Sequence, residues 1–134
     1  HVDIDVQEED LARWITFYVD HGGDLSKLTV SSDASKTGPQ TLFEQIRNCA
    51  RGHRLPLSQV LALVTRNTAE VLKLTKKGRL EPGAHGDILM LDRGEFRIVH
   101  VLAQGKHIVD DGHLVAPETF LEGSNREIAL IGEG

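Results

Sequence analysis

The sequence predicts an α/β fold in two parts, and three observations lead to this prediction. Strand-like segments alternate with amphipathic helices over residues 1–76, which is typical of parallel strands covered by helices. From residue 77 onward, glycines and turn residues recur between short β-type runs, which is typical of a small antiparallel sheet. The chain of 134 residues is 40% hydrophobic and 26% charged, an ordinary composition for a globular protein. We therefore expect two domains, residues 1–76 and 77–134.

The first part begins with a strand and a helix. Residues 2–6 alternate apolar and acidic side chains, the period of a half-buried strand. Residues 8–21 change to a helical period and place Leu11, Trp14 and Ile15 on one apolar face. Glu8, Glu9 and Asp10 are expected in the first helical turn, where negative charge suits the helix dipole.

A second strand and three helices complete the first part. The strand covers residues 28–32, and helices are predicted over residues 40–51 and 57–64. Asn67 or Thr68 is expected to cap a short fourth helix that runs to Leu74. The order of elements is therefore β-α-β-α-α.

The second part contains several turn signals. Gln104-Gly105 and Asp111-Gly112 each separate two short apolar runs, as in β-hairpins. Four strands are predicted, over residues 87–91, 98–103, 106–109 and 113–115. Phe120 and Leu121 are expected to pack, and residues 128–131 to add a strand.

Composition indicates which binding partners and which cellular location to expect. The formal net charge is −5 without a basic stripe, so we expect no nucleic-acid partner. No apolar run reaches the roughly 18 residues of a membrane span, so we expect no membrane partner. The single cysteine, Cys49, cannot form an internal disulfide and is expected to be a small buried residue on a helix. This cysteine usage favours a reducing, cytoplasmic location.

Asp33 is the candidate functional residue. It follows the predicted strand Leu28–Ser32 and precedes a loop of small residues. Parallel α/β folds gather their chemistry at the carboxyl ends of the strands. Asp33 is therefore either an active-site carboxylate or an ordinary turn residue, and its position in the chain leaves both interpretations open.

Several segments resemble the amidohydrolase superfamily. Gly78-Arg-Leu-Glu-Pro-Gly-Ala-His-Gly-Asp-Ile-Leu-Met-Leu-Asp92 is similar to its carboxyl-terminal signature, and residues 99–114 resemble the hairpin that follows. Residues 64–74 are similar to the helix before the signature, and Thr29-Val-Ser-Ser-Asp33 resembles a barrel strand that ends in a metal-site aspartate. Within the superfamily, the order of these segments most resembles the isoaspartyl dipeptidase family.

This resemblance implies a (β/α)8 TIM-type barrel and a small antiparallel β-sandwich. A complete barrel takes about 250 residues, so we expect the chain to hold only the last barrel strands and helices and a portion of the sandwich. The resemblance implies that Asp33 is a zinc ligand and the acid/base of dipeptide hydrolysis. It also implies that Thr37 and Ser35 bind the substrate, that the complete enzyme holds a binuclear zinc site, and that it forms a homo-oligomer.

The family's other metal ligands have no counterpart here. Histidines stand at seven positions without a His-x-His or i, i+4 ligand pair, and we expect all of them to be surface or turn residues. They are His1, His21, His53, His85, His100, His107 and His113. We therefore expect the isolated chain to be inactive.

Two alternatives to an isoaspartyl dipeptidase stay open. One is another amidohydrolase, of the dihydroorotase or N-acyl-amino-acid deacylase type. The other is a non-catalytic α/β binding module, in which Asp33 is a turn residue.

Overall fold

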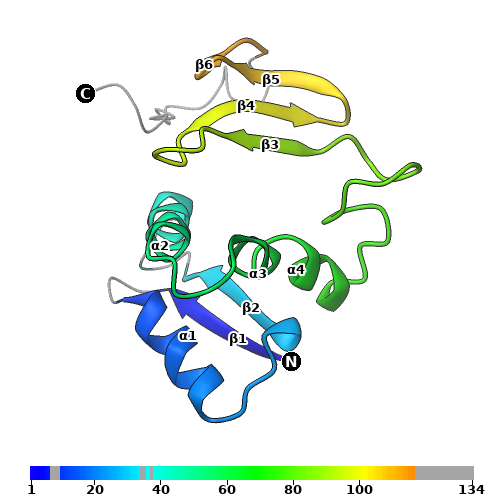
Figure 1. Ribbon diagram of the computed structural model, residues 1–134. Coiled ribbons are helices and arrows are strands. Elements are labelled where there is room, and N and C mark those ends of the chain that lie inside the picture. Colours follow the sequence, from blue (N-terminus) through cyan, green and yellow to red (C-terminus); the bar gives the residue numbers. More distant parts are fainter. Residues whose placement is uncertain (7–9, 34–35, 37, 117–134) are drawn as a thin grey trace. The chain divides into compact units, whose positions relative to one another are not determined.

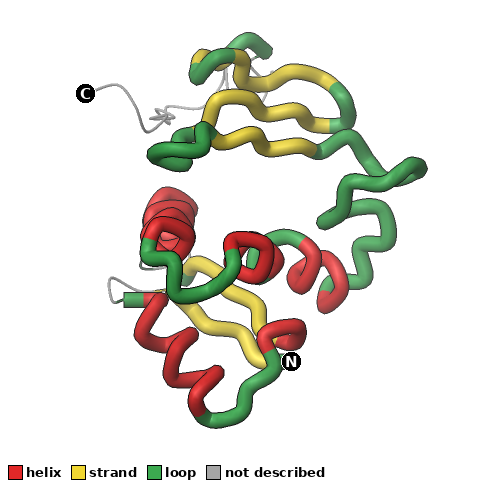
Figure 2. Tube along the Cα trace, in the orientation of Figure 1, coloured by secondary structure: helices red, strands yellow, loops and turns green. Residues whose placement is uncertain are grey.

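The computed structural model describes residues 1–6, 10–33, 36 and 38–116. The chain divides into two compact units, His1–Glu81 and Pro82–Gly134. Figure 2 shows that, within the described residues, the helices lie in the first unit and the second consists of strands and loops. This arrangement confirms the predicted change from an α/β part to an antiparallel part.

The first unit is built on two parallel strands, β1 (Val2–Val6) and β2 (Leu28–Ser32). Their register places Asp3 opposite Thr29 and Asp5 opposite Ser31, so these four polar residues share one face. Val6, Leu28 and Val30 are buried on the other face. The alternation read from residues 2–6 therefore separates a polar face from an apolar face, as predicted.

Helix α1 (Leu11–Asp20) follows β1 in Figure 1. Asp10 is its N-cap, and the Asp10 carboxylate accepts a hydrogen bond from the Ala12 amide at 3.1 Å. The prediction that Asp10 lies in the first turn was wrong, because α1 begins at Leu11, and Glu8 and Glu9, predicted in the same turn, lie outside the described residues. Leu11 and Ile15 are buried, whereas Trp14 on the predicted apolar face is 45% exposed.

Three further helices follow β2: α2 (Pro39–Arg51), α3 (Leu57–Ala62) and α4 (Arg66–Val71). Pro39 suits the first turn of α2, where an amide donor is not needed. Ile46, Cys49, Val60 and Leu63 join the apolar core.

Asn67 does not cap α4, contrary to the sequence prediction. Thr65 occupies the cap position, and Asn67 lies inside the helix with 2% of its surface exposed. The Asn67 side-chain amide donates to the carbonyls of Leu25 and Leu28, both at 2.8 Å. Leu25 begins the 3-10 turn η1 (Leu25–Lys27), so Asn67 fixes the entry to β2.

The second unit is a four-stranded antiparallel sheet in the order β3-β4-β5-β6. Its strands are Ile88–Leu91, Ile98–Ala103, Lys106–Asp110 and His113–Leu114. Gln104 and Gly105 join β4 to β5 and have φ of 50° and 78°. Asp111 and Gly112 join β5 to β6 and have φ of 47° and 78°, so both predicted turns are confirmed. Positive φ at both central residues matches the right-handed twist of a hairpin.

Some predictions lie outside the described residues. These are the substrate-contact roles of Ser35 and Thr37, the packing of Phe120 and Leu121, and the strand over residues 128–131. Among the described helices, none is both long and apolar enough to cross a membrane.

Candidate functional site

Asp33 lies directly beyond the carboxyl end of β2, as predicted. Its side chain is 22% exposed, and its carboxylate lies 3.9 Å from the Lys36 ammonium group. The Asp33 carbonyl also accepts a hydrogen bond from the Lys36 amide at 2.9 Å, which closes a tight turn. Asp33 is thus a partly buried carboxylate held at a strand end, next to a cation that balances its charge.

The polar face of the β1–β2 pair leads to this carboxylate. Ser31 donates to the Asp3 carboxylate and lies 2.8 Å from that of Asp5, and Thr29 donates to Asp3 at 2.5 Å. Because side chains alternate along a strand, Thr29 and Ser31 share this face, and Asp33 follows just beyond the end of β2. Hydroxyl donors therefore organise the Asp3 and Asp5 carboxylates on this face.

Sequence reasoning missed the part played by Asp3 and Asp5, which it used only as markers of strand period. The signal that could have found them is the parallel register, which sets Asp5 opposite Ser31, two residues before Asp33. A parallel pair brings the carboxyl ends of both strands to one edge.

The metal-binding capacity at Asp33 is partial. Its carboxylate is a suitable oxygen ligand for zinc, but a catalytic zinc site takes three protein ligands. In the described ranges, the one group of three side chains suited to a shared metal ion lies elsewhere and does not include Asp33. Asp33 is therefore one donor of such a site, and the described residues do not place two more beside it.

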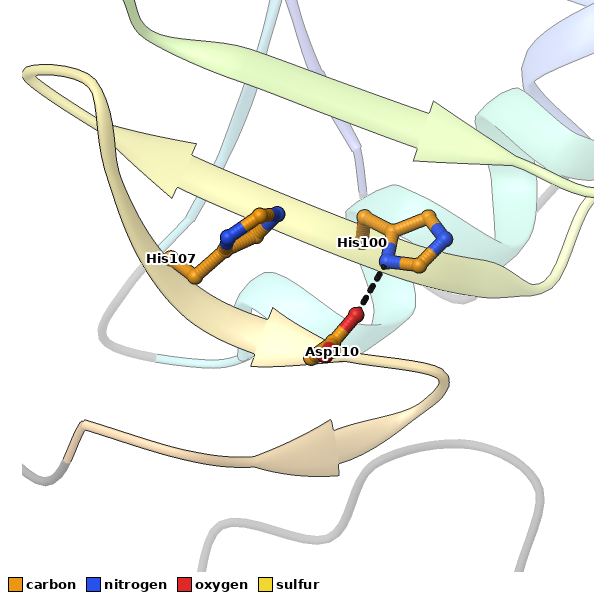
Figure 3. Close-up of side chains that lie close together, drawn as sticks. All are labelled: His100, His107 and Asp110. Atoms are coloured by element: carbon orange, nitrogen blue, oxygen red, sulfur yellow. Dashed lines mark ion pairs between the residues drawn. The ribbon is translucent and has the colours of Figure 1, made fainter.

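That other group lies on the hairpin of β4 and β5 and consists of His100, His107 and Asp110 (Figure 3). One ligand atom from each residue lies within 4.8 Å of the others. His100 Nδ1 is 2.9 Å from an Asp110 carboxylate oxygen, and the two imidazole centroids are 6.2 Å apart. His107 is exposed, as predicted for the histidines, and His100 is partly exposed on an inner strand. The sequence did not predict that the two lie close together on neighbouring strands.

Cys49 is not a candidate nucleophile. It lies on the buried side of α2, which confirms the sequence prediction. Burial, assisted by the negative charge of Asp10, raises the pKa of its thiol to about 11, so the thiolate is scarce at neutral pH.

Comparison with known proteins relates the chain to enzymes that act on amide-like bonds. The model of an amidohydrolase family matches residues 31–116. An adenine deaminase from Halalkalibacterium halodurans is 35% identical over 60 residues, which are 44% of this chain and 10% of that protein.

Solved structures of related enzymes are also similar to this chain. The crystal structure of a β-aspartyl dipeptidase from Fervidobacterium islandicum AW-1 matches 87% of this chain with a TM-score of 0.75 and 27% identity. A second β-aspartyl dipeptidase structure from that organism, in complex with a β-Asp-Leu dipeptide, matches with a TM-score of 0.71 and 24% identity over 87% of the chain. The chain spans 33% and 36% of the lengths of these two chains.

Proposed function

The chain belongs to the amidohydrolase family, and we propose that it is the carboxyl-terminal part of a metal-dependent hydrolase of isoaspartyl dipeptides. In this proposal β1 and β2 are the last strands of a (β/α)8 barrel, and the four-stranded sheet is its share of a small β-sandwich. The observation that carries the proposal is the position of Asp33, a partly buried carboxylate at the carboxyl end of a parallel strand.

Two further observations support this assignment. Active sites of such barrels lie at the carboxyl ends of the strands, where Asp33 stands. The similarity to the β-aspartyl dipeptidase of Fervidobacterium islandicum AW-1 extends over 87% of the chain and favours a dipeptide substrate.

Asp33 would carry the proton of the reaction. An attacking water must lose a proton as it approaches the amide carbon, and the departing amine must gain one. A carboxylate beside both atoms can accept the first proton and donate it to the nitrogen. The Lys36 ammonium lies 3.9 Å from this carboxylate.

Zinc bound in the complete enzyme would supply positive charge that lowers the pKa of a bound water to about 7. Asp33 would be one of its ligands, and the resemblance to this family implies two zinc ions. Because Asp33 is one donor where three are usual, we expect the isolated 134-residue chain to lack hydrolase activity.

Adenine deamination is the second candidate function. The 35% identity to the adenine deaminase over 60 residues favours it, although this stretch is 10% of that protein. Dihydroorotase and N-acyl-amino-acid deacylase activities, and a non-catalytic binding role, are the remaining alternatives. A cytoplasmic location and assembly as a homo-oligomer stay predictions.

The test is Asp33→Asn in the complete protein. The amide keeps the shape of the carboxylate but cannot accept the proton. We expect kcat for β-Asp-Leu to fall by about 10² to 10⁴, the usual contribution of a general acid/base, without loss of fold. The complete protein would also be assayed with adenine, dihydroorotate and N-acyl amino acids as substrates.

Asp20→Asn is the matched control. It makes the same chemical change at an exposed position at the end of α1, and turnover should stay unchanged. Full turnover in Asp33→Asn would remove Asp33 from the mechanism. Turnover of adenine but not of the dipeptide would replace the substrate assignment.

A further inference from the structure

We propose that the hairpin of β4 and β5 carries a zinc site formed by His100, His107 and Asp110. The three side chains lie on one side of the hairpin in Figure 3. This site belongs entirely to the second unit and does not depend on the hydrolase activity proposed above.

A β-bulge creates the cluster. Leu102 pairs with His107 and Val101 pairs with Val109, so Ile108 is an extra residue on β5. One step farther along the hairpin, His100 therefore comes opposite Asp110. In a regular strand, residues three apart lie on opposite faces, but this extra residue returns Asp110 to the face of His107.

The exposure of the side chains agrees with the faces that the bulge assigns to them. Val109 is 4% exposed and points into the sheet's buried side, whereas the Asp110 side chain is 54% exposed. His100 Cα pairs with Met90 on β3, so His100 sits on an inner strand with neighbours on both sides. Its side chain is 32% exposed, which limits its movement while leaving it accessible to an ion.

The donor set favours zinc. Two imidazole nitrogens and one carboxylate oxygen are a common set of three protein ligands for zinc, with water in the fourth position. Magnesium and calcium prefer all-oxygen sites, so the two histidines disfavour them.

The distances fit zinc after small side-chain adjustments. Zinc–ligand bonds of about 2.0–2.1 Å in a tetrahedron place the ligand atoms about 3.3 Å apart. The His100–Asp110 contact is already 2.9 Å, and all three ligand atoms lie within 4.8 Å. Rotation of exposed His107 about its side-chain bonds would supply most of the approach.

The contact between His100 and Asp110 marks the position where a metal ion would bind. Nδ1 of His100 faces the Asp110 carboxylate at 2.9 Å, and the Asp111 amide is 3.4 Å from the same nitrogen. Zinc would bind through the lone pair of Nδ1 and an oxygen of the carboxylate, so a proton on Nδ1 would have to move to Nε2 or to solvent on binding.

A bound zinc ion would link β4 to β5 near the open end of their hairpin. Its binding energy would add to folding energy, because the unfolded chain does not hold the three ligands together. The expected role is to stabilise this sheet.

The experiment is a zinc titration of the metal-free 134-residue chain in competition with a chromophoric chelator. We expect one zinc ion per chain at this site and a higher unfolding temperature in zinc. His107→Ala and Asp110→Asn should each weaken binding by about tenfold or more, since each removes one of three ligands.

His85→Ala and Asp20→Asn are the controls, and both should bind zinc within about twofold of the wild type, a difference worth under half a kcal/mol. His85 is an exposed loop histidine of the same unit and lies outside the cluster. His113 is unsuitable as a control because it pairs with Asp110 and shares its face.

Side-chain ¹⁵N NMR of the wild type tests the site without a substitution. Zinc should shift the imidazole signals of His100 and His107 and leave that of His85 in place. The proposal is overturned if the wild type binds no zinc, if both hairpin variants bind it unchanged, or if the imidazole signals of His100 and His107 do not respond.

Discussion

Replacement of Asn67 by alanine tests how the first unit is held together. The Asn67 side chain is 2% exposed and donates two hydrogen bonds of 2.8 Å, to the carbonyls of Leu25 and Leu28. Alanine removes both donors and leaves the Leu28 carbonyl buried and the Leu25 carbonyl partly buried. The Leu25 carbonyl still accepts a hydrogen bond from the Leu28 amide, so the Leu28 carbonyl is the group that loses its side-chain donor without this replacement.

The magnitude follows from these contacts. Two buried hydrogen bonds contribute about 1 kcal/mol each, and an acceptor left without a donor adds a penalty of about 1 kcal/mol or more. The Asn67 side-chain oxygen has no hydrogen-bond partner among the described residues, so its removal recovers about 1 kcal/mol. The expected net loss is about 2 kcal/mol in the free energy of unfolding.

Urea unfolding of the 134-residue chain, followed by circular dichroism, measures this loss. With a urea m-value of about 1–3 kcal/mol/M, the midpoint should fall by about 0.7–2 M. Asn48→Ala makes the same change at an exposed position of α2 and should shift stability by less than about 0.5 kcal/mol. Equal midpoints for the two variants would refute the assignment of Asn67 as a buried tie between α4 and β2.

Three further substitutions probe single residues. Gly78→Ala should cost about 2–4 kcal/mol in urea unfolding, because φ is +75° and a Cβ would lie 2.6 Å from Ala69 Cβ and 2.8 Å from the Thr65 carbonyl oxygen. Gly83→Ala, with φ of +90° and open space, should cost about 1 kcal/mol, and an equal loss in both variants would contradict the steric argument. For Cys49, the pKa is raised from 9.0 to about 11 in the folded chain, so the thiol's contribution to stability is full below pH 9 and is lost as pH rises through about 11. Unfolding free energies measured from pH 8 to 11 should fall more steeply for the wild type than for Cys49→Ala, and parallel curves would contradict the buried thiol.

The locally encoded features were predicted well. Gln104-Gly105 and Asp111-Gly112 form the expected turns, because glycine and its neighbour adopt positive φ at little cost. The alternation of residues 2–6 predicted a strand, and the period of residues 40–51 predicted α2 to within one residue. Asp33 followed from the same reasoning, since its place after Ser32 depends only on where β2 ends.

Two features of the candidate sites depended on contacts between distant residues. Asparagine is a residue type favoured at helix caps, but packing against η1 and β2 buries Asn67 and gives its side-chain amide two backbone acceptors. His100, His107 and Asp110 show no ligand spacing along the chain, and only the bulge at Ile108 places them on one face.

The sequence by itself determined the two-part organisation, the strand and helix periods, the hairpin turns and the strand-end position of Asp33. These depend on backbone preferences and on the repeat of apolar side chains, which adjacent residues set. The tertiary structure decided which polar groups meet: Asp3 and Asp5 with Ser31, Asn67 with the entry to β2, and His100 with Asp110. Such meetings depend on strand register and packing, where one extra residue moves a side chain to the opposite face of a sheet.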